Sequence, residues 1–151
     1  MDACGSGGGA VLRRLVASVA AIVLVVEAAV LVFVHIVLGA TTHNQAMSIA
    51  GMDPDVMSTT TYAMGAGIGV FLLATAVFLA VTAVRDRPPG RFARALFVVT
   101  AVTHIVLGAL AAALVGWGAF AVTMLIFALL VLTLTLYARA GAEMRITSTS
   151  P

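Results

Sequence analysis

Residues 15–40 read LVASVAAIVLVVEAAVLVFVHIVLGA, a run of 26 residues in which Glu27 is the single charged side chain. A helix of about 20 predominantly apolar residues crosses the ~30 Å hydrocarbon core of a bilayer. The apolar part of a cleaved signal peptide is shorter, at about 7–15 residues. This stretch is therefore predicted to be a retained membrane-spanning helix.

Three more apolar runs follow, and the composition of the whole chain agrees with them. Of the 151 residues, 62% are hydrophobic and 9% are charged, whereas soluble domains carry about 25% charged residues. We predict an all-α polytopic membrane protein, a bundle of four transmembrane helices with the lipid bilayer as its surroundings. The predicted spans are about 15–40, 61–84, 92–115 and 119–137, in a transmembrane domain at 13–139 between flexible tails at 1–12 and 140–151.

All eight basic residues are arginine, and they fall in three segments that four spans place on one side of the membrane. Arg13 and Arg14 precede the first span, four arginines lie within residues 85–94, and Arg139 and Arg145 follow the fourth span. Basic residues stay preferentially on the cytoplasmic side, so both termini are predicted to be cytoplasmic. This arrangement explains the net charge of +2 without a nucleic-acid partner. Because the chain lacks lysine and is rich in Ala, Val and Gly, we expect a high-GC bacterial source and a location in the bacterial plasma membrane.

The connections between the spans carry turn signals. Residues 85–90 read RDRPPG, where proline ends a helix and glycine permits the turn. The sequence GWG at residues 116–118 is a minimal hairpin, which makes the third and fourth spans antiparallel neighbours. In the outer loop, Asp53 is placed to cap a helix whose first residue is Pro54.

Glycines mark the predicted contacts between helices. Gly65 and Gly69 lie one turn apart in the second span, and Gly108 is a candidate in the third. Small residues let helix backbones approach closely in lipid, either within one chain or between two chains. The hexapeptide HIVLGA occurs at residues 35–40 and again at 104–109. Duplication of a two-helix hairpin and chance among common membrane residues both account for this repeat.

Glu27 is the acid predicted to lie inside the membrane. It lies ~20 Å along the helix from Arg14 at ~1.5 Å per residue, near the midplane. An acid there costs roughly 2.5–3.5 kcal/mol and usually faces a cavity or the protein interior. His104 is predicted at a similar depth, which makes Glu27 and His104 a candidate pair. The pair either relays protons, since histidine titrates near neutral pH, or forms a structural hydrogen bond.

Histidine and methionine side chains are weaker candidates for holding a metal. A haem bound by His35 and His104 needs both residues at one depth, and helix counting separates them by ~16 Å from one end or ~6 Å from the other. His43, Met47 and Met52 carry the soft ligands that Cu(I) prefers, although methionine is also a common apolar filler. We expect no cofactor. Because the sequence offers no nucleophile with a base, no phosphate loop and no carboxylate pair, the protein is predicted not to be an enzyme.

The segments VVEA at residues 25–28 and RDRPPGRFAR at residues 85–94, together with the short third connection, carry a resemblance. In these features the chain resembles the small uncharacterised four-span integral membrane proteins of actinobacteria. That resemblance implies a four-span fold and no particular activity. The chain is also similar to the small multidrug transporters in having four spans with a Glu in the first, a position that Glu27 matches. Those transporters have a weakly biased charge, unlike the one-sided arginines of this sequence.

Taken together, the sequence favours a non-enzymatic integral membrane protein that acts through interaction with another membrane protein or through homo-oligomerisation. The alternative is a proton-coupled small transporter that uses Glu27. A third hypothesis is a haem or copper redox accessory protein.

Overall fold

The structure, a computed structural model, describes residues 6–45, 51 and 53–148, with side chains for residues 8–45, 51 and 53–142. The chain forms two compact units. One, the terminal unit, comprises Met1–Val23 and Thr75–Pro151, and the other, the hairpin unit, comprises Leu24–Ala74. Each unit is described by itself below.

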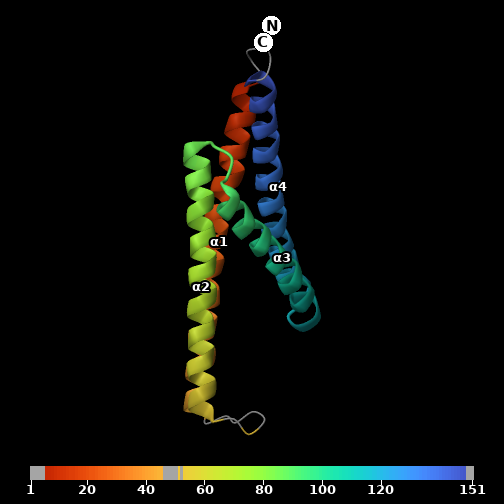
Figure 1. The fold of residues 1–151 in the computed structure, drawn as a ribbon. Helices are drawn as coiled ribbons and strands as arrows, with labels where there is room; N and C mark the ends of the chain where they lie inside the picture. The colour runs from red at the N-terminus through yellow and green to blue at the C-terminus, as the bar shows by residue number, and fades with distance from the viewer. Residues whose placement is uncertain (1–5, 46–50, 52, 149–151) are drawn as a thin grey trace. The chain divides into compact units, whose positions relative to one another are not determined.

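Four helices and no strand occur in the residues that the structure describes (Figure 1). They are α1 (Ser6–Asn44), α2 (Pro54–Arg85), α3 (Arg91–Leu114) and α4 (Trp117–Ser148). Each contains a segment long and apolar enough to cross a bilayer, as a ~30 Å hydrocarbon core requires. The prediction of an all-α protein with four membrane-spanning helices is confirmed.

The helices are longer than the predicted spans. Helix α1 begins at Ser6, inside the segment predicted as a flexible tail, and α4 continues to Ser148. Extending an existing helix adds one hydrogen bond for each residue fixed, without a new nucleation step. An apolar span therefore carries the helix into flanking residues that show no apolar pattern of their own.

The start of α2 follows the predicted capping pattern. The Asp53 carboxylate accepts the backbone N–H of Asp55 at 2.8 Å, and the Asp53 carbonyl accepts the N–H of Met57 at 3.1 Å. Pro54, which has no N–H to satisfy, is the first helical residue. The prediction of Asp53 as the N-cap is confirmed, and α2 begins seven residues before the predicted span.

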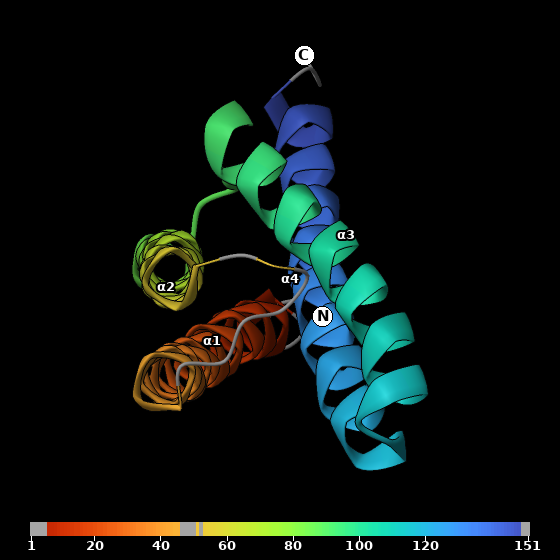
Figure 2. The ribbon, with the colours of Figure 1, turned by 90° about the horizontal axis from the view of Figure 1, so that it is seen from below.

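Helices α3 and α4 of the terminal unit lie side by side and antiparallel (Figures 1 and 2). The N–H groups of Val115 and Gly116 both donate to the Ala111 carbonyl, at 2.9 and 2.8 Å. Gly116 has φ +125°, a conformation that side chains disfavour, and α4 begins at the next residue. The predicted minimal hairpin is confirmed.

In the hairpin unit, α1 and α2 approach closely where glycine faces a larger side chain. A Cβ built on Gly65 would lie 2.5 Å from His35 Cβ, and one built on Gly69 would lie 2.6 Å from Val32 Cγ2. The Ser58 hydroxyl also donates to the Gly39 carbonyl of α1 at 2.9 Å. In the terminal unit, a Cβ on Gly108 would lie 2.5 Å from Met124 Cε. The structure thus places all three candidate glycines against a neighbouring helix of the same chain.

Candidate functional site at the arginine-rich end of the terminal unit

An ion pair in the terminal unit joins α1 to the residue that follows α2. Arg13 Nε donates to Asp86 Oδ1 at 2.9 Å, and Arg13 NH2 donates to Asp86 Oδ2 at 2.8 Å. The two side chains are 21% and 25% exposed, so the pair is largely shielded from solvent. Two parallel bonds between a guanidinium and a carboxylate fix orientation as well as distance.

The last turn of α2 receives side chains from two other helices. The final four carbonyls of a helix have no partner within it. Arg14 Nε of α1 donates to the Ala83 carbonyl at 3.1 Å, and the Tyr137 hydroxyl of α4 donates to the Thr82 carbonyl at 3.2 Å. The positive charge of Arg14 also suits the partial negative charge at a helix C-terminus.

Tyr137 is the centre of this end of the terminal unit. Its side chain is 1% exposed and packs with Ala17 and Ala83, two small residues that leave room for the ring. Arg13 lies over the ring, with its Cζ 5.8 Å from the ring centroid, within the range of a cation–π contact. The position near a membrane interface predicts an amphipathic ring here, but the ring is buried in the protein.

Asp86 directly follows α2 and has a left-handed conformation, with φ +46°. Aspartate tolerates this region better than most residues. The hydrogen bonds from Arg13 hold the pKa of Asp86 below its ordinary value of 3.8, the charges of Arg13 and Arg14 act in the same direction, and partial burial opposes them. Asp86 is therefore an anion over the whole physiological pH range.

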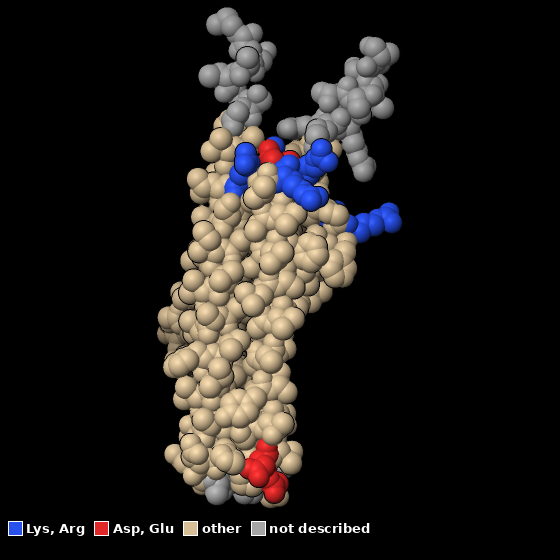
Figure 3. Space-filling model, turned by 90° about the vertical axis from the view of Figure 1, so that its left-hand side faces the viewer, with Lys and Arg blue, Asp and Glu red and all other residues tan. Residues whose placement is uncertain are grey.

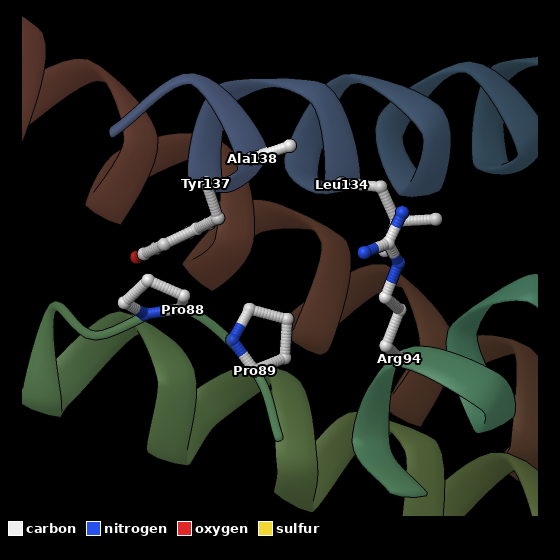
Figure 4. Close-up of a pocket in the computed structure, with 6 residues that line it drawn as sticks. All are labelled: Pro88, Pro89, Arg94, Leu134, Tyr137 and Ala138. Atoms are coloured by element: carbon white, nitrogen blue, oxygen red, sulfur yellow. The ribbon is translucent and has the colours of Figure 1, made fainter. Parts of the chain in front are cut away.

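A groove lies beside this ion pair, between the loop after α2 and the facing surfaces of α3 and α4 (Figure 4). We call it the Arg94 groove. It is lined by Pro88, Pro89, Arg94, Leu134, Tyr137 and Ala138. The groove has a volume of about 50 Å³, and it opens beside Gly141 and Ala142 into a shallow hollow of about 590 Å³. The Arg94 side chain reaches from α3 towards α4 across the groove (Figure 4).

Basic side chains gather at this end of the terminal unit (Figure 3). Arg85, Arg87, Arg91, Arg94 and Arg139 are exposed. Among the side chains that the structure describes, none of these five forms an ion pair. They leave a cationic surface around the Arg94 groove.

Glu27 is half-buried in α1, between the buried Leu24 and Ala28, and it is not an unpartnered group. It belongs to the hairpin unit, whereas His104 belongs to the terminal unit. The pairing of Glu27 with His104 stays a prediction.

The two histidines of the HIVLGA repeat make the same local contact. Nδ1 of His35 lies 2.7 Å from the Leu31 carbonyl, and Nδ1 of His104 lies 2.7 Å from the Thr100 carbonyl. Because a carbonyl can only accept, Nδ1 carries the proton in each contact. His104 is completely buried and His35 is half-buried. Haem binding by this pair stays a prediction.

His43 in the last turn of α1 bonds to Asp55 in the first turn of α2, with Nδ1 2.9 Å from Oδ1. Met47 and Met52, the other candidate copper ligands, lie outside the described residues. Within those residues, no group of three or more His, Cys, Asp or Glu side chains is placed to hold a metal ion.

Sequence reasoning missed the contacts of Arg13, Asp86 and Tyr137. One signal could have suggested them, because Asp86 is the one acid in a ten-residue segment with four arginines. An acid in that setting is a natural partner for a basic residue, although the pattern does not say which one.

The chain matches no protein-family model, and comparisons with the curated proteins and with the solved structures give no match. Fold and composition define the class. This is an integral membrane protein with four candidate membrane-spanning helices in the described residues.

Proposed function

We propose that the protein is a non-enzymatic, multi-pass component of a bacterial plasma membrane, with both termini in the cytoplasm. It acts by associating in the bilayer with another membrane protein or with a second copy of itself. The proposal is supported by an exposed small-residue surface on α2, described next.

The run Gly65-Ala66-Gly67-Ile68-Gly69 presents glycine on two sides of α2. Gly65 and Gly69 are buried against α1, as described above. Ala66 and Gly67 are exposed, and a Cβ built on Gly67 would meet no described atom within 4 Å. Ala63, one turn earlier on the same face, is also exposed. This second face, Ala63, Ala66 and Gly67, is not used by the packing of the hairpin unit.

Glycine inside a helix is about 1 kcal/mol less favourable than alanine. In lipid, this cost of glycine is offset when the helix backbone packs closely against another helix. Small residues are accordingly enriched at contacts between membrane helices. Gly65 and Gly69 have such a contact with α1. Gly67 is also a glycine, but it lies on the side of α2 that faces away from α1. We therefore favour a helix from outside this chain as the partner of Gly67.

The test compares leucine substitutions on two sides of α2. Gly67→Leu should disrupt association, because a large side chain holds the partner backbone away, while the protomer keeps its thermal stability. Ala80→Leu is the matched control, since Ala80 is also exposed and lies about 140° around the helix at 3.6 residues per turn. Association is measured by light scattering in a mild detergent and by identifying the proteins that co-purify.

Wild-type protein that is a monomer with no consistent partner would contradict this proposal. So would a Gly67→Leu variant that keeps the wild-type oligomeric state and the same co-purifying proteins.

Proton-coupled transport through Glu27 is the second candidate function. One observation favours it, since Glu27 is half-buried within the first span rather than fully exposed at the lipid-facing surface. Acids inside membrane spans usually face the protein interior or a water-filled cavity and mark proton or substrate pathways.

A further inference from the structure

Arg94 lies in the first turn of α3, a helix long and apolar enough to span a membrane. It is the fourth residue of α3, ~4.5 Å from the helix start at ~1.5 Å per residue. The groove it crosses joins the beginning of one candidate span, Arg91–Leu114, to the end of another, Trp117–Ala142. Phospholipid headgroups occupy this boundary between hydrocarbon and water.

The charge of the groove is not neutralised by the described part of the protein. Asp86 is the one acid with a described side chain at this end, and Arg13 bonds to both of its carboxylate oxygens. Arg94 is exposed and has no ion pair among the described side chains. A basic pocket between membrane helices attracts anionic lipid headgroups.

The walls of the groove match the two chemistries of a phospholipid headgroup. The Arg94 guanidinium can donate two parallel hydrogen bonds to a phosphate, a geometry that lysine lacks. Pro88, Pro89, Leu134 and Ala138 present apolar surface beside it, which suits a glycerol backbone and the start of an acyl chain. The hollow of about 590 Å³ beside it is open at the surface, so a headgroup could enter while its acyl chains stay in the bilayer.

We infer that the Arg94 groove is a binding site for the phosphate headgroup of an anionic phospholipid, with Arg94 as the phosphate ligand. A soluble phosphate ester shares the charge but gains nothing from the apolar walls, so a lipid is the favoured occupant. This inference does not depend on the proposed association through Gly67, because the two surfaces belong to different units of the chain.

The experiment measures lipid binding to the purified protein in mild detergent, by native mass spectrometry and by thermal shift. The lipids are phosphatidylglycerol, which is anionic, and phosphatidylcholine, which is zwitterionic. We expect phosphatidylglycerol to bind more tightly and to raise the Tm more. Arg94→Gln should weaken phosphatidylglycerol binding by about tenfold, the effect of losing one charge-assisted interaction.

Two further variants distinguish lipid binding in the Arg94 groove from attraction of anionic lipid by the net positive charge of this end. Arg85→Gln removes the same charge from the same end but lies outside the Arg94 groove, and it should change binding by about twofold or less. Ala138→Leu keeps every charge but fills the groove, so it should also weaken phosphatidylglycerol binding. This variant tests the site even if Arg94→Gln fails to fold.

Three results would overturn the inference. Equal binding of the two lipids would mean that the groove does not select an anion. Equal losses in Arg94→Gln and Arg85→Gln, with no loss in Ala138→Leu, would assign the binding to net charge alone. Inorganic phosphate or glycerol phosphate that displaces phosphatidylglycerol at equal concentration would make the ligand a soluble phosphate instead of a lipid.

Discussion

The Arg13–Asp86 ion pair fastens the end of α2 to α1 through two short hydrogen bonds. We expect Asp86→Asn to lower the free energy of unfolding by about 1 kcal/mol, since the pair is partly shielded and doubly bonded. The pKa of Asp86 is lowered in the folded protein, so its contribution to stability is complete above the ordinary value of 3.8. That contribution is lost as the pH falls below this value and through the lower pKa of the folded state.

The measurement is thermal unfolding in detergent between about pH 6 and pH 3. The wild-type protein should lose stability at the acid end, and the difference between it and Asp86→Asn should shrink there. A difference that stays constant over this range would show that the charge of Asp86 does not stabilise the fold.

Glu27→Gln separates the two functions considered for this chain. Glutamine keeps the shape of glutamate and much of its hydrogen bonding but cannot release a proton near neutral pH, so the variant should fold with a near-wild-type Tm. Proton transport predicts that proton flux into liposomes, followed with a pH-sensitive dye, is lost in Glu27→Gln and partly kept in Glu27→Asp. Wild-type protein with no flux above empty liposomes would remove the transport hypothesis.

At the residue scale, the sequence placed Arg13 before the first span and read the segment containing Asp86 as a turn, but it predicted no ion pair between them. Six arginines lie within residues 13–94, and several of them could reach one carboxylate. Which arginine pairs with Asp86 depends on the left-handed conformation of Asp86 and on the position of Tyr137. Both of these depend on how three helices pack together. The arginine cluster was therefore evident in the sequence, but the site that Arg13, Asp86 and Tyr137 form was not predicted.

The helices themselves were largely predictable, since an apolar run of span length in lipid has few alternatives to a helix. Asp53 and the Gly116 turn were predicted because each is a local signal with a local cause. The helix ends were less predictable. Extension of α1 to Ser6 and of α4 to Ser148 depends on continuation from a stable neighbour, which no residue pattern near the ends reveals.

Gly65→Leu tests the close approach of α1 and α2 within the hairpin unit. A Cβ on Gly65 would already lie 2.5 Å from His35 Cβ, so leucine forces the helices apart. Overpacking of this kind costs about 1–3 kcal/mol, and the Tm in detergent should fall. The control is Ala80→Leu, which adds a leucine at an exposed position of the same helix outside the proposed association surface. Equal Tm values for the two variants would contradict the role assigned to Gly65.

At the scale of the whole molecule, the arginine distribution predicts the orientation in the membrane. Asp55 lies in the first turn of α2 and Arg85 in its last turn, so the two signs of charge occupy opposite ends of one helix. The sequence contains one cysteine, Cys4, which is first replaced by serine. Thr59→Cys should then react with an impermeant thiol reagent on whole cells, and Gly90→Cys should not. Both positions are exposed, and Thr59 avoids the positive φ of Gly51. The reverse labelling pattern would overturn the predicted orientation.

The Arg13–Asp86 contact can form only late in the synthesis of the first two helices. Its two residues are 73 positions apart in the chain, and ribosomes add about 5–20 residues per second. The first helix therefore waits roughly 4–15 s after Arg13 is made before its partner exists. During that interval α1 lacks this contact, and a chain whose translation stops before residue 86 never acquires it. Completion of the second helix is thus the step at which Arg13, near the beginning of the chain, gains its carboxylate partner.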